Sequence, residues 1–313
     1  MAILAQQGGA IRAALAAHAL VGRSSVCAVQ LEVRLASAEH ARLSYRDGAW
    51  SVRDLGSKNG TFVNGERLAA GSARALAAGD LLAFGDPEAT WTLVDASPPV
   101  PMARRLSDNA LLAGAGALLA LPSADDPRAC VVEMEDGRFV AEIEGQSRPA
   151  HDGEVLQLGG EAFMLHLPTP PTATADANER AGGIDEAELR FRVSRDEEAV
   201  ELTVVRRGEA RVLAPRSHHY MLLTLARARL RDRDAGALAP PQRGWVFVDE
   251  LCRMLSMDEN KLNVEIYRVR QEMSAAGLTS AAAVIERRRG SRQLRVGTER
   301  LAVAPMADPR AGA

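Results

Sequence analysis

The sequence predicts a multidomain protein, with an all-β N-terminal domain, a β-rich middle module and a C-terminal α+β domain. The first observation behind this prediction is length, because 313 residues suffice for about two or three hydrophobic cores. The second is a pair of Pro-rich stretches, 98–101 and 168–172, which are typical of linkers. The third is periodicity, which indicates strands before the second stretch and adds helical repeats only after residue 217. The expected division is 1–97, 98–168, a linker at 169–187, 188–303 and a tail at 304–313.

Composition and charge exclude several classes of protein. A formal net charge of −3 does not suit a chain that binds nucleic acid along its whole length, so any such surface must be local. Residues 1–7 lack a basic leader pattern, and the apolar run 110–121 is shorter than the roughly 20 residues of a membrane span. Cys27, Cys130 and Cys252 lack the paired spacing of a zinc site or a disulfide framework. We therefore expect a cytoplasmic protein without a membrane partner, a metal or another cofactor.

The segment from Asp54 to Gly65 holds the most specific motif of the first domain. Asn59-Gly60 and Asn64-Gly65 are turn dipeptides, and the three residues between them strongly prefer strands, so we expect turn, strand and turn. Upstream, Gly22-Arg23 and the residues from Ser37 to His40 lie near expected strand ends. Such turns hold polar side chains at fixed heights above a sandwich, which suits binding rather than catalysis.

Together these motifs resemble the forkhead-associated (FHA) domain over about residues 1–97. The resemblance implies a sandwich that binds phosphothreonine peptides, with Arg23 and Ser37 on the phosphate and Asn59 on the peptide backbone. Lys58 lies where the family varies and would tune peptide preference. A phosphate offers close to two negative charges and three acceptor oxygens, so each charge-assisted bond contributes roughly 1.5–3 kcal/mol. The resemblance assigns bracing roles to four further residues: Gly22, His40, Asn64 and Gly65. The alternative is a sandwich of this fold without a working pocket.

The middle module repeats part of the first domain. Residues 41–55, with Asp47-Gly48 at a turn, match residues 130–144, with Asp136-Gly137 at a turn. Residues 79–82 likewise match 153–156, but nothing corresponds to His40 or to the segment 57–65. The repeat therefore predicts a degenerate FHA-like module that forms hairpins, lacks the phosphate-binding set and serves packing or interaction.

The third region combines strands, helices and a basic hairpin. Residues 189–193 and 200–204 alternate as half-buried strands, and Ser217 is expected to cap a helix. A second helix is expected near 248–255, and a third from Asp258 to a stop at Gly277. Residues 284–296 then predict a basic hairpin, which completes a winged-helix pattern.

Within the third helix, residues 263–270 are similar to the recognition helix of the OmpR/PhoB-type winged-helix domains of bacterial transcription regulators. With Leu262 and Ile266 buried, the pattern predicts one exposed side carrying Asn263, Tyr267, Arg270 and Ser274, with Arg268 beside them. The resemblance implies that Asn263, Tyr267, Arg268 and Arg270 meet DNA in the major groove, and that the hairpin adds Arg287, Arg288, Arg289 and Arg292. Glu265 departs from the family pattern. Two alternatives remain: a solvated basic face, and a winged helix that contacts only protein.

The sequence contains no recognisable catalytic set. His218 and His219 are adjacent and are expected to point apart, and no nucleophile elbow or phosphate-cradling Gly-Lys-Ser/Thr motif occurs. We therefore expect no enzyme, but a regulator that couples Ser/Thr kinase signalling, through phosphothreonine-peptide binding, to double-stranded DNA and transcription control. The alternative is an adaptor that recruits a phosphorylated protein to a signalling or secretion assembly. Phosphorylation of the linker threonines would allow closure or a homodimer; these are Thr169, Thr172 and Thr174.

Overall fold

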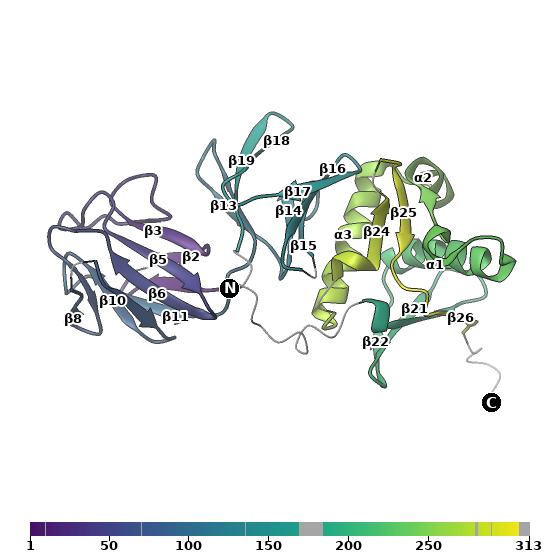
Figure 1. Cartoon of the computed structure of the whole chain (residues 1–313), viewed down its shortest axis with the longest axis horizontal. Coiled ribbons are helices and arrows are strands. Elements are labelled where there is room, and N and C mark those ends of the chain that lie inside the picture. The colour runs from purple at the N-terminus through teal and green to yellow at the C-terminus, as the bar shows by residue number, and fades with distance from the viewer. Residues whose placement is uncertain are drawn as a thin grey trace. The chain divides into compact units, whose positions relative to one another are not determined.

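The computed structural model describes residues 1–306 except 10, 70, 135, 169–183, 279–280 and 289. The chain divides into two compact units, Met1–Gly114 with His151–Ala175 and Ala115–Ala150 with Asp176–Ala313. Strands predominate in both, and the three α-helices of the described residues all follow residue 217 (Figure 1). The expected middle module therefore contributes strands to both units. The linker threonines lie outside the described residues.

Two sheets, antiparallel except for the parallel β3–β4 pair, form the main sandwich of the first unit. One has the order β2-β1-β11-β10-β7-β8, from β2 (Arg12–Ala14), β1 (Ile3–Gln6), β11 (Thr90–Asp95), β10 (Leu81–Phe84), β7 (Thr61–Val63) and β8 (Glu66–Arg67). The other has the order β4-β3-β5-β6-β9, from β4 (Val29–Gln30), β3 (His18–Gly22), β5 (Ala41–Arg46), β6 (Ala49–Asp54) and β9 (Ala73–Leu76). Alternate residues of both sheets are buried in one core that includes Leu43, Trp50, Val52, Leu82 and Leu93. The predicted β sandwich is confirmed.

A four-stranded sheet completes the first unit and shows the predicted repeat. It has the order β13-β12-β19-β18, from β13 (Leu111–Ala113), β12 (Met102–Arg105), β19 (Glu161–His166) and β18 (Val155–Leu158). Before β10, the amide of Gly79 donates to the carbonyl of Leu93 at 2.8 Å, and before β18 the amide of Gly153 donates to Leu165 at 2.9 Å. In both turns a carboxylate, of Asp80 or Glu154, accepts from the amide three residues earlier. The sequence match between residues 79–82 and 153–156 thus corresponds to two turns with the same hydrogen bonds.

The second unit begins with an antiparallel sheet from the centre of the sequence. Its order follows the chain, through β14 (Leu118–Pro122), β15 (Pro127–Glu133), β16 (Phe139–Ile143) and β17 (Gln146–Ala150). The β15–β16 hairpin corresponds to β5–β6, as the repeat predicts, and Gly137 takes a positive φ like Gly48. Helix α3 (Glu259–Ala275) packs against β14 and β15.

The remaining strands and helices of the second unit surround one large core. One sheet has the order β22-β21-β20-β26, with β22 (Glu209–Leu213), β21 (Val200–Arg206), β20 (Glu188–Val193) and a parallel β26 (Leu301–Pro305). The other has the order β23-β25-β24, with β23 (Val246–Phe247), β25 (Gln293–Val296) and β24 (Ile285–Arg288). Helices α1 (His218–Ala235) and α2 (Val248–Leu255) complete it with α3 (Figure 1). No helix of the described residues is long and apolar enough to cross a membrane.

The helix ends follow local sequence in one case and not in another. Asp258 caps α3 by accepting a hydrogen bond from the amide of Lys261 at 2.8 Å, as expected. Ser217 precedes α1 but does not cap it, because its backbone is already helical and its hydroxyl lies 3.5 Å from a carboxylate oxygen of Glu265. That expected cap is wrong.

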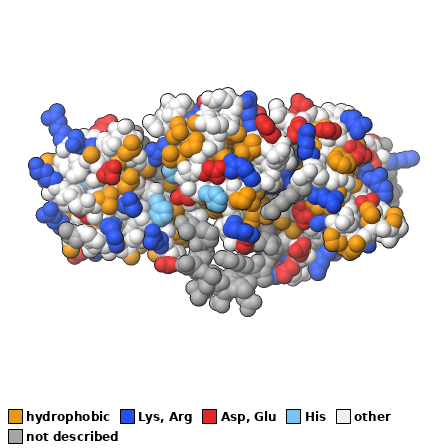
Figure 2. Space-filling view, turned by 45° about the horizontal axis from the view of Figure 1, so that its top comes forward, with side chains coloured by type: hydrophobic (Ala, Val, Ile, Leu, Met, Phe, Trp, Pro, Cys, Tyr) orange, Lys and Arg blue, Asp and Glu red, His pale blue; other side chains and the backbone are white. Residues whose placement is uncertain are grey.

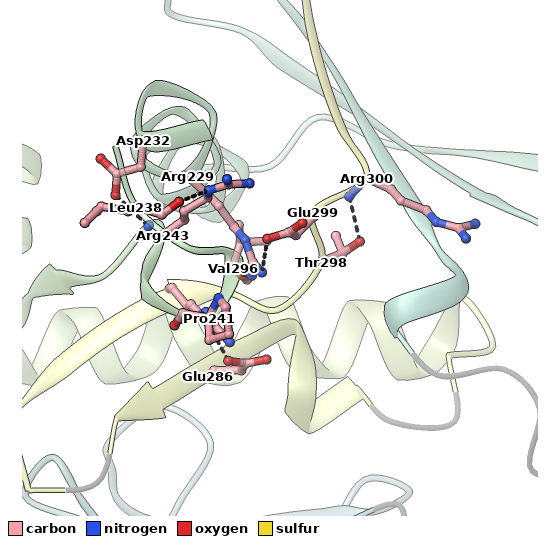
Figure 3. Close-up of polar contacts among 12 residues, drawn as sticks. Arg229, Asp232, Leu238, Pro241, Arg243, Glu286, Val296, Thr298, Glu299 and Arg300 are labelled. Atoms are coloured by element: carbon pink, nitrogen blue, oxygen red, sulfur yellow. Dashed lines mark hydrogen bonds and ion pairs between the residues drawn. The ribbon is translucent and has the colours of Figure 1, made fainter. Parts of the chain in front are cut away.

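A buried arginine ties α1 to the segment between β25 and β26. Arg229 donates to the carbonyl of Val296 and pairs with Glu299 at 3.2 Å (Figure 3). In the same segment, the hydroxyl of Thr298 accepts from the amide of Arg300 at 3.0 Å. Because a buried guanidinium without partners would be costly, these bonds fix how α1 lies on the C-terminal strands.

Candidate functional site

Arg23 is held where β3 ends, against the loop of residues 31–40. Its amide donates to the carbonyl of Ser37 at 3.0 Å, and its Nε donates to the carbonyl of Ala36 at 2.6 Å. Gly22 permits this approach, because an added Cβ would overlap the carbonyl oxygen of Ala38. The side chain of Arg23 is exposed, and no carboxylate of the described residues pairs with it. Its two terminal nitrogens are therefore available to an anion.

Ser37 joins Arg23 to the loop between β6 and β7. Its carbonyl accepts from the amide of Arg23, while its hydroxyl oxygen accepts from the amide of Lys58 at 3.2 Å. Asn59 donates its side-chain amide to the carbonyl of Leu35 at 2.7 Å, and Lys58 is exposed. The four residues predicted to contact phosphopeptide thus converge on one loop, 31–40. The arrangement brings a guanidinium, a hydroxyl and a side-chain amide to this loop, and the exposed Lys58 lies next to them in the chain.

Asp54, at the end of β6, organises the loop that carries Lys58 and Asn59. Its Oδ1 accepts from the amides of Gly56 and Ser57, both at 2.9 Å. Its Oδ2 accepts from the hydroxyls of Ser57 at 2.6 Å and Thr61 at 2.7 Å. Burial alone would raise the pKa of Asp54, but these hydrogen bonds outweigh it and lower the pKa. The sequence-based assignment overlooked this residue, although an Asp three residues before a Ser is a recognisable turn pattern.

His40 joins the loop of residues 31–40 to the loop between β6 and β7. Its Nδ1 accepts from the amide of Ser37 at 3.0 Å, and its Nε2 lies 3.0 Å from the carbonyl of Gly60, to which it donates in the neutral tautomer. The ring is fully buried, and burial lowers the pKa of His40 despite that carbonyl and nearby Asp54. Through these two contacts His40 links Ser37 to Gly60, and its bracing role stays a prediction.

The predicted Asn64-Gly65 turn braces the opposite side of β7. Asn64 takes a positive φ of 52°, and its side chain donates to Asp80 and accepts from the amide of Leu81, both at 2.8 Å. Gly65 follows with a φ of 81°. The turn therefore ties the end of β7 to the start of β10 through these hydrogen bonds.

Residues 19–85 match the family model of the FHA domain. The N-terminal part of this chain contains an FHA domain. A stretch of 45 residues is 47% identical to the FHA domain-containing protein FhaB of Mycobacterium tuberculosis, and it covers 14% of this chain and 29% of FhaB. The chain therefore spans less than a third of the length of that curated relative.

Solved structures also align with part of the chain. Mycobacterium tuberculosis EmbR in complex with a low affinity phosphopeptide is 26% identical, with a TM-score of 0.28, over 31% of this chain and 25% of EmbR. The FHA domain of an Arabidopsis thaliana hypothetical protein is 26% identical, with a TM-score of 0.28, over 31% of this chain and 86% of that protein.

The residues predicted to contact DNA have a different environment from the expected one. Tyr267 is 5% exposed and Arg270 is 1% exposed, so the prediction of one exposed side of α3 is wrong for both. The physical reason is that β14 and β15 cover this side of the helix. Asn263 is half-buried, and its Oδ1 accepts from Arg287 at 2.9 Å.

Glu142, on β16, binds both buried arginines of this face. Arg270 donates Nη1 to Oε2 at 2.7 Å and Nη2 to Oε1 at 2.9 Å, and Nη2 also reaches the carbonyl of Ile285. Arg287 donates Nε to Oε2 at 3.0 Å. Burial alone would raise the pKa of Glu142, but the two guanidinium groups lower it to about 2. No pattern in the sequence pointed to this partner, because Glu142 is a single acid in a strand.

The other predicted basic contacts remain at the surface. The side chain of Arg268 is 45% exposed and lies 3.4 Å from Glu265, and Arg292 pairs with Glu259 at 2.6 Å. Arg288 is exposed and lies over the ring of Trp245, whereas Arg289 falls outside the described residues. On the face shown in Figure 2, Lys and Arg side chains are interspersed with Asp and Glu.

The adjacent histidines at the start of α1 converge instead of pointing apart. The Nε2 atoms of His218 and His219 each lie 2.7 Å from the same carboxylate oxygen of Glu272 on α3. The expectation of divergent rings is therefore wrong, because the acid reaches both from the facing helix. The carboxylate links α1 to α3 through these two contacts.

Proposed function

We propose that the chain is a phosphothreonine-peptide-binding regulator, and that Arg23, Ser37, Lys58 and Asn59 hold the peptide. The observation that carries this proposal is the state of Arg23. Its Nε is anchored to Ala36, while its two terminal nitrogens have no carboxylate partner among the described residues. An anchored but unpaired guanidinium is suited to bidentate binding of a phosphate.

The site would bind its ligand through hydrogen-bond donors held in fixed positions, and it would catalyse no reaction. The phosphate oxygens accept from Arg23, the Ser37 hydroxyl and Lys58, and the anchored Asn59 presents its amide oxygen to a peptide N–H. Because Asp54 and His40 hold the loops before ligand arrives, little ordering entropy is lost on binding. An FHA domain of this kind recognises a phosphorylated protein, so a Ser/Thr kinase is the implied partner.

Binding of a degenerate phosphothreonine peptide library to the full chain tests this proposal. Arg23→Ala removes two charge-assisted bonds of about 1.5–3 kcal/mol each, so affinity falls at least about 100-fold. Ser37→Ala costs at least about tenfold, because it removes one charge-assisted hydroxyl bond to the phosphate of roughly 1.5–3 kcal/mol. Arg42→Ala is the matched control, because Arg42 is an exposed arginine on β5, outside the loop of residues 31–40 and the loop between β6 and β7. Equal affinity of the Arg23 and Arg42 variants would refute the site.

We further propose that the C-terminal part is a winged helix that acts on DNA in response to this capture. Three helices followed by the β24–β25 hairpin support it, as does the convergence of Arg270 and Arg287 on one anion. Duplex affinity should fall steeply with salt, and Arg268→Ala with Arg292→Ala should reduce that slope.

A non-DNA-binding adaptor that recruits a phosphorylated protein to a signalling or secretion assembly is the second candidate. The observation in its favour is the burial of Tyr267 and Arg270 by strands of the same chain. It predicts no duplex affinity above background at any salt concentration, even where phosphopeptide binding is intact.

A further inference from the structure

One side of α3 is covered by a sheet that lies more than 100 residues earlier in the sequence. Glu142 of β16 accepts hydrogen bonds from both Arg270 and Arg287, and Arg287 in turn donates to Asn263. Three of the residues proposed to contact DNA are therefore engaged by one another and by a single carboxylate.

The apolar part of this contact is small and separate from the main core. Tyr267 packs among Leu118, Ala120, Cys130, Val132 and Ala282, which form a cluster of their own. The main core of the second unit, with Leu262, Ile266, Val269 and Met273, lies on the other side of α3. Four apolar residues of α3 therefore pack in the main core independently of the sheet, and we expect the helix to keep these contacts when the sheet is displaced.

In the charged part of the contact, another anion can take the place of the Glu142 carboxylate. A carboxylate and a phosphate both accept a bidentate guanidinium, and a buried ion pair adds little net stability because desolvation offsets its attraction. Beside the pair lies a polar cleft of about 660 Å³, lined by Arg128, Glu144 and Gln146 on one side and by Glu259, Asn260, Asn263 and Arg292 on the other. Solvent and ligand therefore reach the edge of the contact.

We propose that the β14–β17 sheet is an intramolecular mask of α3, held by Glu142 in the place of a DNA phosphate. The inference rests on the proposed DNA-binding function and names its regulation. Sheet and duplex compete for Tyr267, Arg270 and Arg287, so the two states exclude each other. Displacement of the sheet is then the step that a regulatory signal controls.

Duplex binding by the full chain tests the mask. The probe is a fluorescent 30-base-pair duplex of mixed sequence, at two salt concentrations. Glu142→Gln keeps the shape of the side chain but removes its charge, and we expect at least tenfold tighter binding than by the unaltered chain. Asp136→Asn is the matched control, because it removes one acid from an exposed turn of the same sheet and should leave affinity unchanged.

Alkylation of Cys130 gives a readout that does not depend on DNA. This thiol lies in the cluster with Tyr267, and burial raises its pKa to about 11, so it reacts slowly while the sheet is docked. Mass spectrometry of the alkylated peptides should show faster reaction of Cys130 in Glu142→Gln, with Cys27 unchanged as an internal reference. An unaltered circular dichroism spectrum of Glu142→Gln would show that the variant has not unfolded. Glu142→Asp, which keeps the charge, is the second control for undocking of the sheet.

The outcomes distinguish the mask from the function it controls. Tighter duplex binding together with faster Cys130 alkylation supports the mask. Equal duplex affinity of the unaltered chain and Glu142→Gln overturns the mask while DNA binding stands. Faster alkylation with no duplex binding by any variant refutes DNA binding, and with it a mask against DNA. No change in alkylation shows that Glu142 does not hold the sheet.

Discussion

Asp54→Asn provides the sharpest test of how the phosphopeptide loop is built. Oδ1 of the asparagine can still accept from the amides of Gly56 and Ser57, as Asp54 does at 2.9 Å. The side-chain nitrogen, however, donates where Oδ2 accepted two hydroxyls, of Ser57 at 2.6 Å and Thr61 at 2.7 Å. Hydrogen bonds to a carboxylate contribute about 1.5–3 kcal/mol each, against about 1 kcal/mol for neutral pairs, so two weakened bonds cost roughly 2 kcal/mol.

Hydrogen exchange of the full chain measures this cost locally. Opening of the loop should become about 30-fold more frequent, since about 1.4 kcal/mol corresponds to a factor of ten. We expect this acceleration in peptides that span Gly56 to Gly60, together with weaker phosphopeptide binding. Asp86→Asn, in the exposed turn after β10, is the control. Exchange of the loop at the unaltered rate would refute the role assigned to Asp54.

Two further predictions concern the residues beneath the site. The pKa of His40 is lowered in the folded state, so the unfolded state takes up the proton first as pH falls. Stability of the loops should therefore be full above about pH 6.5 and decline as pH falls further, and His40→Gln should flatten this dependence in thermal unfolding of the FHA domain. Stability is the better readout than affinity, because the phosphate itself titrates near pH 6. Gly22→Ala should reduce phosphopeptide affinity at least about tenfold, since its Cβ displaces the loop at Ala38, and titration with the peptide library would measure this; unchanged affinity would mean that the close approach is dispensable.

The predictions that were confirmed depend on local chemistry. Asn-Gly pairs specify their turns through positive φ, and the Asp258 cap depends only on an amide three residues away. For the same reason the β sandwich and the hairpin of residues 284–296 could be anticipated from alternation and turn signals.

The predictions that were wrong depend on partners distant in the sequence. The helical repeat distinguishes an apolar from a polar side of α3. It does not show that a strand more than 100 residues earlier in the sequence contacts the polar side. In the sequence alone, Glu142 cannot be distinguished from an acidic residue of an exposed strand, because its partners Arg270 and Arg287 are distant in the chain. The rings of His218 and His219 converge only because Glu272 of another helix reaches both. Ser217 failed as a cap because Glu265 of α3 lies near its hydroxyl.

The β14–β17 sheet is connected through the polypeptide chain to the first unit at both of its ends. The polypeptide leaves the first unit after Gly114, builds the sheet, and re-enters that unit at His151 before it supplies the rest of the second unit. The sheet is therefore tethered at both ends to the unit that contains the FHA domain. A single proteolytic cut between β17 and β18 would leave it attached through β13. A fragment that begins at residue 184 would lack the sheet altogether, so it would present Tyr267 and Arg270 uncovered and report only the open state of α3.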